Sequence, residues 1–140
     1  MKKTVFSLVA LTAVIVAGCS KDNDNGSPEK MIQGKWTPVS TTVKVTDIQN
    51  GGTTTSNKPV YQGDYLDFRS DGKLYRRTTD PSEGPGYDPH DTLTYQFSRT
   101  YLIIEDDSML ISKLTNDSLS FILQEQDANK LWETTYSLKK

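Results

Sequence analysis

Apolar and polar residues alternate in short runs along most of the chain. Leu93, Tyr95 and Phe97, for example, alternate with Thr94 and Gln96. A period of two places every second side chain on the same face, which is the pattern of a half-buried strand. The abundance of Thr, Tyr, Val and Ile also favours strands. Runs of this kind predict eight strands, at residues 36–47, 65–69, 74–79, 93–97, 101–105, 109–114, 119–124 and 132–138.

The connections between these strands are mostly short and carry turn residues. Asp71-Gly72 stands between two alternating runs and predicts a hairpin turn in which both residues have positive φ. Two connections are longer: residues 53–59 are polar, and residues 80–91 contain three prolines and two glycines. We expect both to be irregular loops.

The segment from Ser27 to Gly34 predicts a short helix before the first strand, with Ser27 as its N-cap and Pro28 at its first position. Short sequential connections favour an antiparallel meander, and eight such strands can close into a barrel that has no edges. The predicted fold is therefore all-β: an antiparallel up-and-down eight-stranded β-barrel with a short N-terminal helical turn. We expect Trp36 to fill the closed end beside that turn, and loop 80–91 to lie at one mouth.

The start of the chain has a different pattern. Two lysines follow Met1, an apolar run extends from Val5 to Val16, and small residues precede Cys19. This is the pattern of a secretory signal, and the run is shorter than the roughly 20 residues of a membrane span. The junction at Cys19 resembles a bacterial lipobox, which implies cleavage before Cys19 and a thiol that carries lipid chains such as palmitate. The expected organisation is a signal peptide (1–18), a lipidated cysteine with a flexible tether (19–30) and a β-barrel domain (31–140).

The residues after Cys19 bear on location. Ser20 stands where an aspartate favours retention in the inner membrane, so it resembles an outer-membrane signal. Lys21, Asp22 and Asp24 resemble the signal of bacteria that export lipoproteins to the cell surface, although a solvated tether would look the same. We expect a lipid-anchored protein of the outer membrane, exposed at the cell surface, whose membrane contact is the lipid on Cys19.

Charge and cysteine content narrow the function classes. Without residues 1–18 the chain has 14 basic and 18 acidic residues, a formal net charge of −4. The basic residues form no long run, so nucleic acid is not an expected partner. Cys19 is the only cysteine, and once it is lipidated the protein has neither a disulfide nor a reactive thiol.

Catalytic and metal-binding patterns are weak. His90 is the only histidine, and together with Asp88 and Asp91 it suggests a metal site or an acid–base group. A solvated loop histidine is the better interpretation, because no second histidine lies nearby in the sequence. No serine has a nucleophile-elbow context, and no phosphate-binding loop is present. We therefore expect no enzyme activity, no metal and no cofactor.

Three segments together resemble a known family. Gly34-Lys35-Trp36 resembles the Gly-x-Trp signature of lipocalins, and the segments 66–73 and 111–119 resemble later motifs of the lipocalin-like domain family of bacterial outer-membrane lipoproteins. The resemblance covers most of residues 31–139. It implies a small up-and-down β-barrel on a lipid tether, in a family whose members largely lack an assigned ligand.

Three tripeptides resemble an O-glycosylation sequon of bacteria with surface lipoproteins. Their acceptor residues are Thr92, Ser108 and Ser118, each near a predicted strand start. Glycans belong on exposed turns, so modification of one or more is a hypothesis.

Aromatic residues that carry a hydroxyl or indole N–H group suggest what kind of ligand the protein binds. Strand alternation groups Tyr95 with Leu93 and Phe97, and Trp132 with Tyr136. Buried hydroxyl and indole groups need hydrogen-bond partners, so Tyr95, Trp132 and Tyr136 are the predicted lining of a pocket for a small amphipathic molecule. The first hypothesis is a lipid-anchored, cell-envelope binding module. The alternative is a protein-interaction module, such as an enzyme inhibitor or an accessory subunit of an outer-membrane complex.

Overall fold

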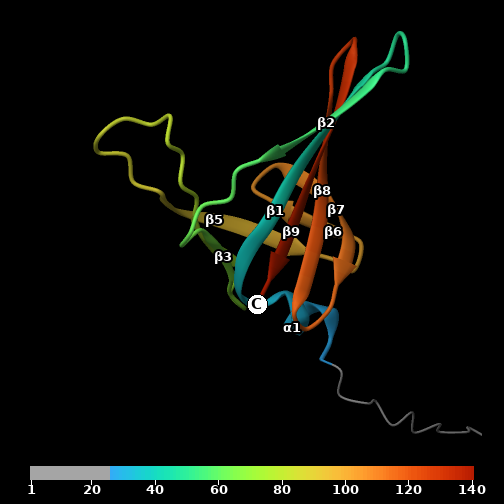
Figure 1. The fold of residues 1–140 in the computed structure, drawn as a ribbon. Coiled ribbons are helices and arrows are strands. Elements are labelled where there is room, and N and C mark those ends of the chain that lie inside the picture. The colour runs from blue at the N-terminus through green and yellow to red at the C-terminus, as the bar shows by residue number, and fades with distance from the viewer. Residues whose placement is uncertain (1–25) are drawn as a thin grey trace, which may run out of the picture.

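The structure is a computed structural model, and it describes residues 26–140 (Figure 1). The predicted signal peptide and Cys19 lie outside the described residues. The described part contains one short helix and nine strands: α1 (Pro28–Ile32), β1 (Gly34–Asp47), β2 (Thr53–Lys58), β3 (Tyr65–Phe68), β4 (Lys73–Arg77), β5 (His90–Phe97), β6 (Tyr101–Ile104), β7 (Asp107–Leu114), β8 (Ser118–Gln126) and β9 (Lys130–Lys139). Within residues 26–140, no helix combines the length and the apolar character that crossing a bilayer requires.

The strands form a closed antiparallel barrel. From β3 to β9 each strand pairs with the next in sequence, and β1 pairs with both β3 and β9, which closes the ring. Eight strands, β1 and β3 to β9, make up this ring. The prediction of an all-β, antiparallel, up-and-down eight-stranded barrel with a short N-terminal helical turn is confirmed.

The ninth strand, β2, corrects the prediction of an irregular loop at residues 53–59. Thr53 to Lys58 pair in register with Thr41 to Thr46 of β1, and every β2 residue is exposed. Because both faces of β2 are solvated, its sequence carries no apolar alternation, which is the signal that identifies a half-buried strand. The hairpins β1–β2 and β8–β9 extend beyond the other strands as an arm, at the top of Figure 1.

The barrel wall has a break where β1 changes partner. Gly34 to Trp36 pair with β3, whereas β2 pairing begins at Thr41. Pro38 lies between them and has no N–H to donate. On the other side of β1, the register with β9 shifts between Pro38 and Ser40, which is a β-bulge. The chain from β2 to β3 passes this break, and this passage positions the site described below.

The closed end of the barrel is sealed as predicted. Trp36 is fully buried, and its Nε1 donates a 2.6 Å hydrogen bond to the carbonyl of Ile32 at the end of α1. The ammonium of Lys140 lies 4.7 Å from the centre of the Trp36 ring and donates to the carbonyl of Met31. One helical turn, one strand and the chain end therefore meet on a single indole.

The start of α1 is as predicted, with Ser27 as its N-cap and Pro28 in its first turn. The Ser27 side chain makes no capping hydrogen bond, and its carbonyl accepts the N–H groups of Lys30 and Met31. The prediction for the β3–β4 turn needs correction. In the β3–β4 turn only Gly72 has a positive φ, +80°, and Asp71 does not. This turn therefore has one residue with positive φ and not the two of the predicted turn type. The Asp71 carboxylate accepts the N–H of Lys73 across it.

Candidate functional site

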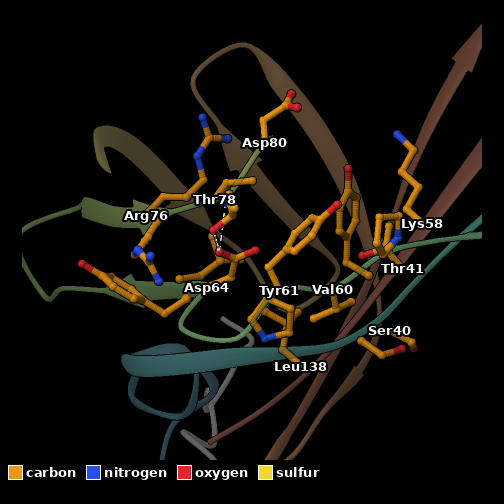
Figure 2. Close-up of a pocket in the computed structure, with 18 of the residues that line it drawn as sticks. Ser40, Thr41, Lys58, Val60, Tyr61, Asp64, Arg76, Thr78, Asp80 and Leu138 are labelled. Atoms are coloured by element: carbon orange, nitrogen blue, oxygen red, sulfur yellow. Dashed lines mark hydrogen bonds between the residues drawn. The ribbon is translucent and has the colours of Figure 1, made fainter. Parts of the chain in front are cut away.

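A cavity of about 590 Å³ lies beside the break in the barrel wall. It is bordered by β1 residues after the break, by the chain that connects β2 to β3, by residues 76–81 and by the inner faces of β6 to β9 (Figure 2). Its apolar lining includes Leu66, Ile104, Met109, Phe121 and Leu138. All of these except Leu66 are buried, so the cavity reaches the hydrophobic core.

Tyr136 is the aromatic residue that joins this apolar lining to the polar part. It is directly opposite Phe121 on β8 and Thr41 on β1. Its ring stacks on Phe121 with centroids 5.0 Å apart and planes 29° apart. Burial raises the pKa of the Tyr136 phenol, with a smaller contribution from Glu125, while Arg76 acts in the opposite direction. The hydroxyl is therefore neutral at physiological pH and remains a hydrogen-bond donor.

Asp64 fixes one wall of the cavity. It is only 7% exposed, and its Oδ1 accepts hydrogen bonds from the N–H and the hydroxyl of Thr79, at 2.9 and 2.8 Å. These two bonds, dashed in Figure 2, connect the chain after β2 to the chain after β4. Gly63, next to Asp64, has a φ of +92°, and a Cβ there would clash with the guanidinium of Arg77. This wall therefore depends on a buried carboxylate and on a glycine.

Arg76 is the charged side chain of greatest interest. It lines the cavity between Leu66 of β3 and Asp91 of β5, its directly opposite neighbours in the sheet. Its Nη2 lies 2.6 Å from the Asp91 carboxylate. Its Nε is buried and has no hydrogen-bond partner in the part of the chain that the structure describes. Buried donors are nearly always paired, so this N–H is an exception among the described residues.

The basic and acidic side chains that line the cavity are equal in number. Three basic and three acidic side chains belong to its lining: Lys58, Arg76, Arg77, Asp64, Asp80 and Asp107. Figure 2 shows Lys58, Tyr61, Asp64 and Asp80 around the same space. The arrangement combines an apolar interior with separate hydrogen-bonding groups at its border.

The structure separates the three residues predicted to bind a ligand. Tyr136 lines the cavity, but Tyr95 and Trp132 are not among the lining residues. The Tyr95 hydroxyl donates to the carbonyl of Arg69 at 2.7 Å, and its ring packs edge-on against Phe68. Trp132 lies on the arm, where β9 pairs with β1 and β8. A ligand in this cavity would contact Tyr136 without contacting the other two.

The sequence did not single out Asp64 or Arg76. Both are ordinary charged residues in a chain with many, and only the fold brings them to one cavity. One signal was available, because Pro38 interrupts a predicted strand and proline is confined to edges and bulges of sheets. This proline marks the place where β1 stops pairing with β3.

The other chemical candidates lie on the surface. His90 is exposed at the start of β5, and its Nδ1 lies 2.8 Å from the Asp88 carboxylate. Hydrogen bonds from the His90 N–H and ring hold the pKa of Asp88 below its usual range. Among residues 26–140, no cluster of three metal-ligating side chains exists.

The three residues of the proposed glycosylation motifs stand at or near strand starts, as expected. Thr92 and Ser108 are exposed, and Ser118 is half-buried. Their modification stays a prediction.

The chain matches no protein-family model and no curated protein. The resemblance to lipocalin-like lipoproteins therefore stays a prediction from the sequence motifs, and the geometry of the cavity is the basis for the functional argument.

Proposed function

We propose that this protein is a lipid-anchored binding module of the cell envelope for a small, partly apolar molecule. The observation that carries the proposal is the cavity beside the break in β1. Ligand sites are usually concave spaces of roughly 300–1,000 Å³ with mostly apolar walls and a few placed polar groups. The cavity has a volume of about 590 Å³ and an apolar lining that includes Met109, Phe121 and Leu138.

The polar groups of the cavity would orient such a molecule. Arg76 and Tyr136 both belong to the lining, and the Tyr136 ring stacks on Phe121 at the border of its apolar part. The Oδ1 of Asp64 already accepts two hydrogen bonds from Thr79, and these bonds hold the wall in place. The proposed binding mode places an apolar body against Phe121 and a polar end toward Arg76.

Two matched variants of β1 test the cavity. Thr41 lines it, whereas Thr42 is on the opposite face of the same strand, where its hydroxyl donates to Asn57. Thr41→Trp should fill part of the space, and Thr42→Trp should not. The probe is N-phenyl-1-naphthylamine, a neutral dye whose fluorescence rises in apolar surroundings. We expect saturable binding to the wild type and to Thr42→Trp, and at least tenfold weaker binding to Thr41→Trp. Equal binding to both variants would contradict the proposal.

The anchor is the second part of the proposal. It rests on the junction at Cys19, outside the described residues. The mature protein purified from native cells should begin at Cys19 and have the mass of the chain plus a lipid. Cys19→Ala should abolish both the lipid and the cleavage. An unmodified Cys19 in the mature protein would contradict this part of the proposal and would leave the cavity unaffected.

One observation favours the alternative of a protein-interaction module. In the described chain β2 pairs only with β1. In an antiparallel pair, the backbone N–H and C=O groups of successive residues point alternately toward the partner strand and away from it. The Asp47 N–H donates to the Gly52 carbonyl, so Gly52 points toward β1. The backbone groups of Thr53, Thr55 and Asn57 therefore point away from β1. Free strand edges can accept a strand of another protein. A partner cross-linked in native cells that is lost with Thr55→Pro but retained with Thr41→Trp would favour this alternative.

A further inference from the structure

The connections of the barrel fall into two groups, because up-and-down strands place successive turns at opposite ends. Gly34 at the start of β1 pairs with Phe68 at the end of β3, so the β3–β4 turn lies at the closed end, beside α1. The β5–β6 turn, the β7–β8 turn and the C-terminus belong to this same end. The arm, the β4–β5 loop and the β6–β7 turn belong to the other end, and Figure 1 shows α1 and the arm far apart.

These two ends carry opposite charge. The closed end has eight basic and four acidic residues, a net charge of +4, within residues 26–35, 67–73, 98–100, 113–118 and 139–140. The other end has one basic and nine acidic residues, a net charge of −8 with His90 neutral, within residues 47–53, 78–90, 105–107 and 125–130. We call it the acidic end. The mature chain, whose formal net charge is only −4, is therefore polarised along the barrel.

The basic side chains of the closed end are exposed, and several of them lie around α1. All eight basic residues are exposed. Arg99 and Lys113 line one hollow together with Met31 of α1. The ammonium of Lys140 donates to the Met31 carbonyl. These charges come from α1, two turns and the C-terminus, and the fold brings them to one surface.

Most of these positive charges are not compensated by ion pairs. Of the eight basic residues, Arg69 alone forms an ion pair within residues 26–140, with Asp67 at 2.6 Å. At the acidic end, the one ion pair of the described chain joins His90 and Asp88. An anionic surface is therefore attracted by one end of the barrel and repelled by the other.

The length of chain before the described residues limits how far the closed end can lie from the proposed anchor. The described chain begins at Gly26, beside α1, and Cys19 precedes it by seven residues. Seven residues span at most about 25 Å, since an extended chain advances by about 3.5 Å per residue. Anionic headgroups attract Lys and Arg side chains within about one Debye length, roughly 10 Å. A barrel held this close to a membrane can bring its basic end onto the headgroups.

We infer that the closed end of the barrel docks on the anionic headgroups of the bilayer that holds the anchor. This inference rests on the proposed lipid at Cys19 and adds the orientation of the barrel. The same headgroups repel the acidic end, which faces away from the membrane. Residues 78–81 and Asp107, which border the cavity, belong to the acidic end. This orientation therefore leaves the cavity and the arm accessible from the aqueous side.

Lysine reactivity on vesicles tests this orientation. The mature polypeptide, residues 19–140, is coupled through its only thiol, Cys19, to a maleimide lipid in vesicles. One set of vesicles is phosphatidylcholine, and in the other phosphatidylglycerol replaces part of it. N-acetoxysuccinimide, an uncharged reagent, acetylates the lysines, and mass spectrometry measures the rate at each one. We expect Lys73 and Lys113 to react roughly threefold or more slowly on the anionic vesicles, and Lys44 and Lys130 of the arm to react alike on both. High salt should remove the difference, because it screens the attraction.

Two double variants with the same loss of charge test where the charge must lie. Lys30→Gln/Arg99→Gln removes two positive charges from the closed end, and Lys44→Gln/Lys130→Gln removes two from the arm. All four residues are exposed, and both variants change the mature net charge from −4 to −6. The first variant should lose most of the protection of Lys113 on anionic vesicles. The second should retain all of it, because its charges do not face the membrane.

Three outcomes would overturn the inference. If Lys73 and Lys113 react equally on the two kinds of vesicle, the closed end does not dock. If Lys44 and Lys130 are protected as strongly as Lys73 and Lys113, the barrel has no preferred orientation. If the two double variants lose protection equally, the net charge of the protein matters and the basic end does not.

None of these outcomes bears on the anchor itself, because the coupled lipid is synthetic. The anchor is tested by the mass of the mature protein from native cells. An unmodified Cys19 there would contradict the anchor and would leave the vesicle result unchanged, so the two failures are distinguishable.

Discussion

The carboxylate of Asp64 accepts two hydrogen bonds from Thr79, one from its N–H at 2.9 Å and one from its hydroxyl at 2.8 Å. These residues belong to two connections, one after β2 and one after β4, that have no strand pairing with each other in the described chain. The buried carboxylate therefore joins two connections that form one wall of the cavity.

The first prediction concerns this contact. Asp64→Ala leaves the Thr79 N–H without its acceptor in a partly buried position, and such a loss costs about 1–3 kcal/mol. We expect that decrease in the free energy of unfolding, measured in urea, together with weaker dye binding. Asp64→Asn keeps an acceptor oxygen and should lose less of both. Full stability and full binding in Asp64→Ala would show that the wall does not depend on this contact.

The second prediction concerns the closed end of the barrel. Trp36 is fully buried and bonded to α1, so Trp36→Ala should lower the free energy of unfolding by roughly 3–5 kcal/mol, as large aromatic truncations do. Trp132 on the arm is half-buried, and Trp132→Ala is the matched control. It should lose less than half as much. Equal losses at the two tryptophans would mean that the arm contributes to stability as strongly as the core.

The third prediction compares two glycines with positive φ. Gly63 has a φ of +92° and would bring a Cβ onto Arg77, whereas Gly51 has a φ of +72° and open space around it. Alanine is strained at both positions, by about 1 kcal/mol or more, but only Gly63→Ala must also displace a side chain at the cavity. The guanidinium of Arg77 is the end of a flexible side chain and can move at little cost, so we expect similar losses of stability in the two variants. Gly63→Ala alone should weaken dye binding, and Gly51→Ala should leave it unchanged. Unaltered dye binding in Gly63→Ala would show that this connection does not shape the cavity.

The fourth prediction concerns alkaline pH. Burial raises the pKa of Tyr136 above its usual value of 10.0. Between that value and the folded-state pKa, the unfolded chain releases a proton that the folded chain retains, so the stability declines as the pH rises above about 10. Tyr136→Phe removes this proton and should flatten the decline in urea unfolding measured between about pH 9 and 11. Tyr101→Phe, at a half-exposed tyrosine on the outer wall, serves as control. A decline that is as steep in Tyr136→Phe as in the wild type would contradict the assignment.

The barrel could be predicted because its signals are local. Alternation such as that of Leu93, Tyr95 and Phe97 shows which face of a strand is buried, and Trp36 beside a helical turn indicated the closed end. Residues 53–58 could not be predicted as a strand, because a strand that is solvated on both faces has no apolar alternation. Its partner, the second half of β1, lies within the strand predicted at residues 36–47, but nothing in the sequence of residues 53–58 indicates that they pair with it.

The site was less predictable for a related reason. Tyr136 could be placed on an inward face from alternation alone, but Tyr95 has the same pattern and instead donates to the carbonyl of Arg69. Alternation gives the face of a strand and not the height along the barrel, so it cannot decide which inward residues border a cavity. Arg76 and Asp64 have partners 15 residues away in sequence. Their roles depend on which strands are neighbours.

The most direct test of the binding proposal is to locate the dye in solution. Intermolecular nuclear Overhauser effects should connect the naphthyl protons of N-phenyl-1-naphthylamine with the methyl groups of Met109 and Leu138, both of which line the cavity. Val39, exposed on the bulge of β1, should show none. Contacts with Met109 and Leu138 would establish that the cavity takes a small, partly apolar molecule. Contacts confined to exposed residues such as Val39, or no binding at all, would contradict the central claim.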